Sequence, residues 1–498
     1  MYGSVPKSCA FRKFVYRNTE NINEDAPSTF TIMSYNLLSQ TNIRRELFPY
    51  ANSKSLKWKY RKNNLIQEIL HHSPDIACLQ EVGIEHWHVN YKPEFERNGY
   101  NCYIYFSKFK NHGVAIISKK KIFNVIEHLE VPLGHQVQVG DEKQIPANVG
   151  QILVLEFKGN IFSKHEKENN DIEVSDIQKT DSKCIDSELS TLPSSNFSYR
   201  ENEISSTESN SNDKQTKNKR KFSCDEAQQD TKGNLETTNK NDNDNQISSS
   251  SGAKIIIANT HLFWKPEGSF ERLLQMILLL NECKKAISKH SPHCQLVLCG
   301  DFNTTPDDAL YSLLTKQKPF ELTENDIEQL LPCSYEDEKD FVNIENDIGD
   351  GSESPDVLDI KEFEKEQQEA DAIYKNDLNR VQNILQMFNN DFGSMTFKSL
   401  YGAYSDVDPS HSSNDKWQGE PLYTNYTKWK GTLDYIMTLA RTDQENTSFF
   451  LEHQDILSLP PQKHLEPGLP NNNFSSDHIS LLAEINCIIN DNFEKSIL

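Results

Sequence analysis

The sequence predicts a layered α/β fold, because apolar segments typical of strands alternate along the chain with amphipathic segments of helical spacing. The strand-like segments are 30–37, 76–81, 114–117, 151–157, 253–260, 296–300, 433–439 and 479–485. The helix-like segments are 60–72 and 269–288. In the first of these, Leu65, Ile66, Ile69 and Leu70 share one face, and Pro74 follows its end.

Composition excludes several classes of protein. The 498 residues have a net charge of −22 and a mean hydropathy of −0.69. The longest apolar run, around 276–280, is far shorter than the roughly 18–20 residues of a membrane span, so we expect no membrane partner. The ten cysteines form no C-x-x-C pair, which argues against a zinc knuckle and favours a reducing compartment. The negative charge argues against a nucleic-acid partner only if it lies in the folded part.

Residues 160–252 differ in composition from the rest. Only 13 of these 93 residues are Leu, Ile, Val or Phe, too few to offset the entropy of ordering, so we predict disorder. Because strand-like segments flank it, at 151–157 and 254–258, we interpret it as an insertion at the tip of a β-hairpin. The basic cluster 217–221 within it resembles a nuclear-localisation signal.

The segment 321–380 holds most of the negative charge. It has 20 acidic and 5 basic residues, together with apolar residues at helical spacing, so we predict an acidic, partly helical excursion. Its net charge is −15 and that of 160–252 is −6, which leaves −1 on the other 345 residues. The packable part of the chain is therefore almost neutral, and a nucleic-acid partner stays open.

Five short polar segments end or flank apolar strands: Met33-Ser-Tyr-Asn36, Leu79-Gln-Glu81, Asn259-Thr-His261, Gly300-Asp-Phe-Asn303 and Ser476-Asp-His478. Together they form an oxygen-rich ligand set that includes two histidines and no cysteine. Carboxylate and amide oxygens suit Mg²⁺, which leaves coordination positions for phosphate oxygens. Adjacent side chains of an extended segment point in opposite directions, so Asp477 is badly placed to bond the His478 ring. We therefore expect Asp434 to be its partner.

The motifs, in order along residues 28–486, resemble the exonuclease–endonuclease–phosphatase superfamily. The branch is that of the carbon-catabolite-repressor deadenylases, Nocturnin, Angel and the fungal Ngl RNA exonucleases, with the Ngl group nearest. The matching segments are Ser34-Tyr-Asn-Leu-Leu38, Pro74-Asp-Ile-Ala-Cys-Leu-Gln-Glu-Val82, Asn259-Thr-His-Leu-Phe-Trp-Lys-Pro266, Cys299-Gly-Asp-Phe-Asn-Thr304, Tyr423-Thr-Asn-Tyr-Thr427, Lys430-Gly-Thr-Leu-Asp-Tyr-Ile436 and Ser475-Ser-Asp-His-Ile-Ser-Leu481.

This resemblance implies a four-layer α/β sandwich of two facing mixed β-sheets flanked by helices. It implies one catalytic domain over 28–490 after a lead-in at 1–27, interrupted by the two excursions. It also implies a Mg²⁺-dependent 3′→5′ RNA exonuclease that releases 5′-mononucleotides. Two ions are expected, with Mn²⁺ as a substitute, and the substrate is the 3′ end of single-stranded RNA, such as a poly(A) tail or a 3′ extension of an rRNA precursor.

The resemblance also assigns roles to residues. Glu81 corresponds to the principal Mg²⁺ ligand, with Asn36 assisting. Asp301 would orient or deprotonate the attacking water, and Asn303 would contact the scissile phosphate and a second ion. The remaining positions are His478 for the developing charge and as a metal ligand, Asp434 and Asp477 as supporting acids, His261 for phosphate, Asn425 for substrate, and Pro266 and Trp429 for the 3′-terminal base.

Departures from the pattern leave alternatives open. His112-Gly-Val-Ala115 stands where many relatives have Asp-Gly-Cys-Ala, and no leucine-rich repeat precedes the catalytic region, so no dock for a deadenylase complex is expected. A nucleotide phosphatase or a 2′,5′-phosphodiesterase would use the same metal site, and an inactive RNA-binding scaffold is a further alternative. We expect residence in the cytoplasm, the nucleus or both. The first 19 residues are basic and contain no acid, as in a mitochondrial transit peptide, but we expect mitochondria less than the other two compartments.

Overall fold

The computed structural model describes residues 5–16, 29–134, 147–158, 162–163, 253–291, 294–315, 323–332, 360–412, 417–440 and 449–489. Two compact units are distinguished, 1–172 with 251–498 and, separately, 173–250. The second unit and the basic cluster 217–221 lie outside the described residues, so the description concerns the first unit. Within the described ranges no helix is long and apolar enough to cross a membrane.

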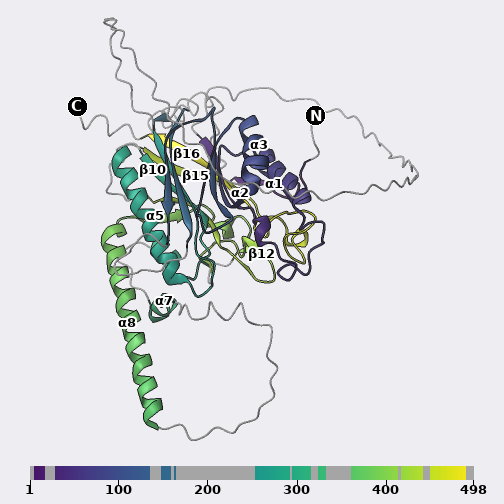
Figure 1. The fold of residues 1–498 in the computed structure, drawn as a ribbon. Helices are drawn as coiled ribbons and strands as arrows, with labels where there is room; N and C mark the ends of the chain where they lie inside the picture. Colours follow the sequence, from purple (N-terminus) through teal and green to yellow (C-terminus); the bar gives the residue numbers. More distant parts are fainter. Residues whose placement is uncertain are drawn as a thin grey trace, which may run out of the picture. The chain divides into compact units, whose positions relative to one another are not determined.

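Two mixed sheets form the centre of this unit (Figure 1). Among the described strands, the first sheet has the order β1 (Phe14–Tyr16), β15 (Phe449–Leu457), β16 (Leu481–Ile489), β2 (Thr29–Asn36), β3 (Ile76–Gly83), β5 (His112–Lys119) and β4 (Tyr100–Phe106), with β8 (Phe162–Ser163) on β16. The second has the order β11 (Phe397–Ser399), β14 (Asp434–Leu439), β10 (Cys294–Asp301), β9 (Lys254–His261), β7 (Val149–Phe157) and β6 (Phe123–Pro132). A small ribbon pairs β12 (Asn425–Tyr426) with β13 (Lys430–Gly431).

Each sheet has two apolar faces. One face packs against the other sheet, and the opposite face packs against helices. Ile255 and Ile257 of β9 pack with Ile32 of β2 in the central core, whereas Ile256 and Ala258 face the helices on the other side. Strand side chains alternate between the two faces of a sheet, so these nearly continuous apolar runs mark strands buried on both faces. The result is the layer order helix, sheet, sheet, helix.

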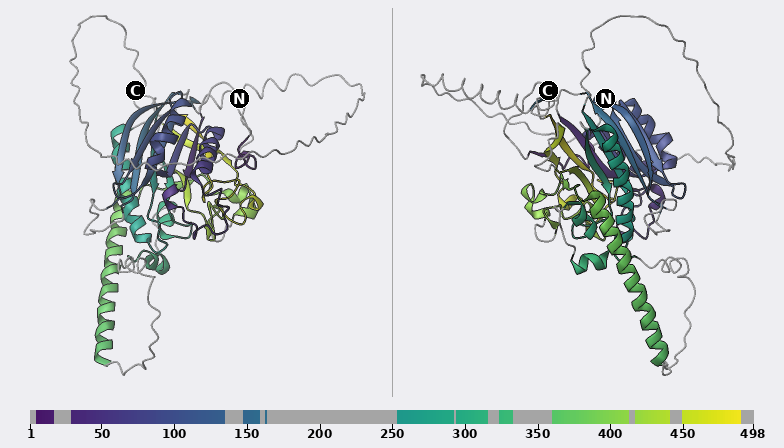
Figure 2. Two further views of the ribbon diagram at one scale, coloured as in Figure 1. Left: turned by 45° about the vertical axis from the view of Figure 1, so that its right-hand side comes forward. Right: turned by 90° about the vertical axis from the view of Figure 1, so that its left-hand side faces the viewer.

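The outer layers are helical. Two helices cover the first sheet: α1 (Trp58–His72), which precedes β3, and α3 (Lys92–Arg97), which follows β3 after α2 (Ile84–His86) and η2 (Trp87–Tyr91). The second sheet is covered by α5 (Ser269–His290), α6 (Ala309–Thr315) and the C-terminal part of α8 (Ile360–Phe392), and α7 (Glu324–Gln329) packs on α6. Both views of Figure 2 show α8 beside α5. Short 3₁₀ turns complete the loops: η1 (Gln40–Asn42), η4 (Tyr404–Asp406), η5 (Pro409–His411) and η6 (Gln462–His464).

A buried amide pair joins the two sheets near their carboxyl ends. Gln80 donates from Nε2 to Asn259 Oδ1 at 2.9 Å, and Asn259 donates from Nδ2 to the backbone oxygens of Leu79 and Ala115. Both amides are fully buried. Since an unpaired buried amide is costly, these bonds fix how the sheets are aligned next to the site.

The four-layer sandwich predicted from the motifs is confirmed. The differences lie at element ends: the last strand runs Leu481–Ile489, not 479–485, because residues 475–480 form a loop held by side-chain bonds. The pairing of β7 with β9 agrees with the hairpin reading of the insertion. Phe162–Ser163, inside the segment predicted to be disordered, pairs as β8 with β16. The rest of 160–252 lies outside the described residues, so its disorder stays a prediction, as does the domain division.

Leu279 of α5 tests this packing. It is fully buried in the outer core, against Gly150 of β7. Leu279→Ala should lower the free energy of unfolding by about 2–5 kcal/mol, measured by urea denaturation, because it leaves a cavity. The matched control Leu47→Ala, where the leucine is 54% exposed, should change it by less than about 0.5 kcal/mol. Equal losses in the two variants would contradict this account of the core.

Candidate active site

Strand register in the second sheet aligns three of the polar residues singled out above. Asp301, the last residue of β10, pairs with His261 of β9 on one side and with Asp434 of β14 on the other. Residues opposite one another on neighbouring strands project from the same face. That face is the inner one, because Val297 and Cys299, which lie four and two residues before Asp301, belong to the central core. The three side chains thus form a row at the edge of the core.

Asn36 brings the first sheet to this row. It ends β2, its side chain is fully buried, and its Nδ2 donates to Asp301 Oδ2 at 2.9 Å and to Glu81 Oε1 at 3.3 Å. Its Oδ1 accepts from the N–H of Leu38 at 2.9 Å. One amide therefore contacts both principal carboxylates, and it joins strand ends of two different sheets.

Glu81 is aimed at the site by an irregularity in β3. The pairing of β3 with β5 shifts between Leu79 and Val82, and Glu81 has a φ of 51°. A bulge re-aims a side chain, and a non-glycine residue in the left-handed region carries strain of about 1–3 kcal/mol. Its Oε2 accepts from the Ser39 N–H at 2.9 Å and from Asn42 Nδ2 at 2.7 Å. The carboxylate is thus held in place by the loop that follows β2.

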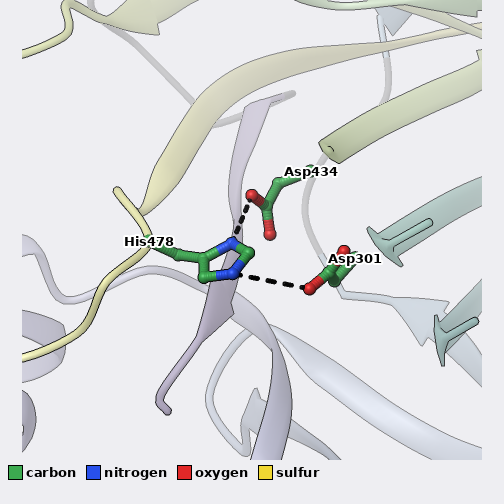
Figure 3. Close-up of side chains that lie close together, drawn as sticks. All are labelled: Asp301, Asp434 and His478. Atoms are coloured by element: carbon green, nitrogen blue, oxygen red, sulfur yellow. Dashed lines mark hydrogen bonds and ion pairs between the residues drawn. The ribbon is translucent and has the colours of Figure 1, made fainter. Parts of the chain in front are cut away.

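Asp434 is the partner of His478, as predicted. Its Oδ2 lies 2.7 Å from His478 Nδ1, and His478 Nε2 faces Asp301 Oδ2 at 3.7 Å, so the imidazole lies between two carboxylates (Figure 3). Thr424 donates from Oγ1 to the same Asp434 oxygen at 2.6 Å. The ring is therefore oriented from one side and directed toward Asp301 on the other.

The charges of the two carboxylates determine the protonation of this ring. Burial alone would lower the pKa of His478, but Asp434 and Asp301 raise it well above its usual value. The pKa of Asp301 is raised by burial and by Asp434, while His478 opposes the shift. The two carboxylates therefore favour the imidazolium form of His478, which can stabilise negative charge and donate a proton.

Glu81 has the opposite character. Burial alone would raise its pKa, but the imidazoles of His261 and His112 and the Ser39 N–H lower it to about 2. These two imidazoles are charged only at low pH, because burial lowers the pKa of each. At neutral pH Glu81 is therefore an ionised carboxylate next to neutral imidazoles.

Asn303 and His261 flank Asp301. The N–H of Asn303, whose φ is 49°, donates to Asp301 Oδ1 at 3.0 Å, and its Nδ2 donates to the backbone oxygen of Leu262 at 3.0 Å. His261 Nε2 lies 3.6 Å from Asp301 Oδ2. Both side chains are partly exposed and can contact a ligand.

The other predicted residues lie further out. Asn425 is buried and forms an isolated bridge with His478, so its backbone contributes to the position of the ring. Burial and the charge of Glu81 raise the pKa of Asp477 to about 6, although His478 opposes the shift. Pro266 is exposed, and Trp429 is 49% exposed with its ring over Gly431. No contact between Pro266 and Trp429 is recorded among the described residues.

The donor set fits a hard divalent cation. Glu81 and Asp301 supply carboxylates on either side of the Asn36 amide, and Asn303 lies next to Asp301. Carboxylate and amide oxygens are the ligands that Mg²⁺ and Mn²⁺ prefer. The Oδ1 atom of Asp434 is buried without a hydrogen-bond partner among the described residues. Donor atoms of Asp301, Asp434 and His478 lie within 4.8 Å of one another, but the imidazolium occupies that group. The partly exposed Glu81 side is therefore the better place for an ion. Asn36 would present Oδ1 there only after its amide turned over.

Sequence reasoning missed several supporting side chains. Thr424, which orients Asp434, lies inside a quoted motif, but nothing marked its hydroxyl as functional. Ser476 donates from Oγ to the backbone oxygen of Asn36 at 2.6 Å. Buried Arg61 of α1 donates to the backbone oxygens of Leu37 and Ser475 and so ties the two site loops together. An arginine on the apolar face of a predicted helix was the available signal.

Comparison with known proteins agrees with this geometry. A model described as the Endonuclease/Exonuclease/phosphatase family matches residues 33–478. The chain belongs to this family. It is 24% identical over 509 residues to "RNA exonuclease NGL2" of Saccharomyces cerevisiae, covering 95% of this chain and 81% of that protein. It is 25% identical to "Carbon catabolite repressor protein 4 homolog 1" of Arabidopsis thaliana, covering 92% of this chain and 58% of that protein.

A solved structure is similar in fold. It is that of ANGEL2, "a 2′,3′-cyclic phosphatase", in complex with adenosine-2′,3′-vanadate; it covers 95% of this chain and 98% of its own, with a TM-score of 0.51 and 21% identity. The resemblance stated from the motifs, including the branch that holds the Ngl, Angel and carbon-catabolite-repressor proteins, is thus confirmed.

The coupling of His478 to Asp434 can be measured by its titration. In wild-type protein held in EDTA, the NMR signal of the His478 ring should stay that of an imidazolium from pH 5 to 8. Asp434→Asn removes the carboxylate charge 2.7 Å from Nδ1 that raises the pKa of His478, and it leaves the lowering effect of burial, so the ring should lose its proton at a lower pH. Because a raised histidine pKa stabilises the fold below about pH 6.5 and the gain is lost as pH rises through the folded value, the variant's loss of stability should shrink at high pH.

The His478→Gln protein supplies the assignment of the signal, since one resonance must vanish in it. An unchanged titration in Asp434→Asn would contradict the coupling.

Proposed function

We propose that this protein is a metal-dependent 3′→5′ exoribonuclease that uses Mg²⁺, with Mn²⁺ as a substitute, and releases 5′-mononucleotides. The observation that carries the proposal is the Asn36 amide, which contacts both Glu81 and Asp301 and so places a cation-binding carboxylate beside a proton acceptor. The relative named as an RNA exonuclease, aligned over 95% of this chain, supports RNA as the substrate.

The residues suggest how hydrolysis proceeds. Asp301 accepts a proton from the attacking water, helped by the raised pKa of its carboxyl group. The water oxygen bonds to phosphorus while the bond from phosphorus to O3′ of the preceding nucleotide breaks. That O3′ takes up a proton from the His478 imidazolium, and the terminal nucleotide leaves with its 5′-phosphate. The His478 imidazolium stabilises the negative charge that builds on the phosphate oxygens.

The other groups bind and orient. Glu81 would hold the divalent ion, with Asn36, Asp301 and Asn303 as further ligands, and the second ion of the predicted pair would lie on the Asn303 side. When bound, such an ion supplies Lewis-acid polarisation of the phosphate. His261 would contact a phosphate oxygen, and Pro266 and Trp429 would hold the 3′-terminal base.

The biological substrate and the compartment are further proposals. The substrate is the 3′ end of a single-stranded RNA, either a poly(A) tail or a 3′ extension of a structural RNA such as an rRNA precursor. The basic cluster 217–221 supports residence in the nucleus, the cytoplasm or both.

Substitution of the two carboxylates tests the reaction. With 5′-labelled single-stranded RNA and Mg²⁺, wild-type protein should shorten the RNA stepwise from its 3′ end, and EDTA should stop it. Asp301→Asn removes the proton acceptor and should lower kcat about 10²–10⁴-fold. Glu81→Gln should lower activity at limiting Mg²⁺ more than at saturating Mg²⁺, because it removes a charged ligand.

The matched control is Glu85→Gln, four residues from Glu81, whose side chain is 66% exposed and should leave the rate unchanged. Full activity in Asp301→Asn would disprove the assignment. Release of phosphate from a nucleotide without any shortening of RNA would favour the phosphatase alternative, and cleavage only of 2′,5′-linked substrates would favour the phosphodiesterase. Binding of RNA without cleavage in any metal would favour the scaffold.

Trp429 tests the base site. Stacking of an aromatic ring on a base contributes about 1–3 kcal/mol, so Trp429→Ala should raise KM for RNA about 5–150-fold. Trp429→Phe keeps an aromatic face and should stay within a few-fold of wild type. A wild-type KM in Trp429→Ala would show that the indole does not contact substrate.

A further inference from the structure

A cavity of about 250 Å³ lies beside the candidate active site. One wall is the turn between β4 and β5, with Phe106, Lys108 and Phe109. The opposite wall is the end of β6 and the start of β7, with Pro132 and Asn148. Neither the metal-binding carboxylates nor His478 line it, so the cavity is separate from the site described above.

The walls combine aromatic surface with positive charge. Phe109 is 61% exposed and Phe106 is 37% exposed, although large apolar side chains usually lie in the core. Lys108 Nζ lies 5.1 Å from the centre of the Phe109 ring. Among the described residues that line the cavity, Lys108 is the charged one and none is acidic. Aromatic faces next to cations are what a single-stranded nucleic acid needs for its bases and phosphates.

The cavity is connected to the active site through Asn148. This residue accepts a hydrogen bond from Lys110 Nζ at 3.1 Å and donates from Nδ2 to the backbone oxygen of His261 at 2.6 Å. The centre of the His112 ring lies 6.4 Å from that of His261. A series of polar side chains therefore leads from Lys108 at the cavity to His261 at the active site. Its members are Lys110, Asn148 and His112.

The surface next to Pro266 carries acidic residues. A second cavity, of about 260 Å³, adjoins Pro266 and is lined by Glu267, Asp307 and Asp308. Asp308 is paired with Arg272 at 3.2 Å, so the like charges that a polyphosphate chain would meet there are those of Glu267 and Asp307. On the β5 side it would meet Lys108 and Lys110 instead. Charge thus gives the substrate a direction across the site.

The aromatic turn is held in place by its own contacts. Lys110 and Phe109 donate their backbone N–H groups to the backbone oxygen and the Oγ of Ser107, at 3.1 and 3.2 Å. Gly113 lets the two strands approach, since a Cβ there would lie 2.1 Å from the Tyr105 backbone oxygen. Groups on a fixed turn bind with a smaller loss of conformational entropy.

We propose that this groove, lined by Phe106, Lys108 and Phe109 and joined to Lys110 through Asn148, binds the single-stranded RNA on the 5′ side of the scissile phosphate. Unpaired bases stack on Phe106 and Phe109, and backbone phosphates contact Lys108 and Lys110. The proposal rests on the proposed exoribonuclease function and adds a substrate subsite to it.

The test is the dependence of KM on RNA length. The double variant Lys108→Ala/Phe109→Ala is compared with wild type on 5′-labelled oligoadenylates from 2 to 12 nucleotides. For wild type, KM should fall as the RNA lengthens. For the double variant this gain should disappear, with KM for the longest RNA at least 10-fold above wild type and an unchanged kcat/KM for the dinucleotide.

The chain offers a matched control in Tyr374→Ala/Lys375→Ala, an exposed aromatic residue beside a lysine on α8. It should follow wild type at every length. The groove is overturned if the Lys108/Phe109 variant keeps the wild-type length dependence, or if it loses activity on the dinucleotide to the same degree as on long RNA.

A failure of the proposed function is distinguishable from a failure of the groove. If wild-type protein shortens no RNA, the exoribonuclease proposal fails. Fluorescence anisotropy of the 12-nucleotide RNA in EDTA then judges the groove by itself. Weaker binding by the double variant than by its control supports the groove, and equal binding overturns it.

Discussion

The hydrogen bond from Asn36 to Asp301 is the constraint on which the site depends, because it joins the carboxyl end of one sheet to that of the other. The buried pair of Gln80 and Asn259 makes the same connection one step deeper in the core. Both bonds lie where the apolar inner faces of the strands end. The hydrophobic core therefore sets the distance between the sheets. The hydrogen bonds of the amides then hold the carboxylates of Glu81 and Asp301 at a fixed position relative to each other.

The charged groups of the site lie in two places, on either side of Asn36. His478 is held as an imidazolium by Asp434 and Asp301, whereas Glu81 is ionised and partly exposed on the other side of Asn36. One part supplies a proton and positive charge, and the other can hold a cation. The left-handed backbone of Glu81 is strain that a purely structural glutamate would not need. The net charge of −22 lies almost wholly outside this core, so it does not oppose an anionic substrate at the site.

Much of this was predictable from sequence, for physical reasons. Apolar residues along a strand mark it as buried on both faces. A polar residue at the end of such a strand is therefore expected at the edge of the sheet, next to the polar residues that end the neighbouring strands. The side chains of Asp477 and His478 were expected to point in opposite directions, which excluded Asp477 as the partner of the imidazole and left Asp434 as the candidate. The bulge at Glu81, the hydroxyl of Thr424 and the cavity beside Phe109 were not predictable, because each depends on how distant strands and loops meet. Residues 164–252 lie beyond the described structure, and their disorder stays a prediction.

Anomalous X-ray diffraction from crystals grown with Mn²⁺ tests the central claim most directly. The account predicts an anomalous peak next to the carboxylates of Glu81 and Asp301, and loss of that peak in crystals of the Glu81→Gln protein. Mn²⁺ bound only at another place, or a peak that persists unchanged without the Glu81 carboxylate, would contradict the claim that the junction of the two sheets is a metal site.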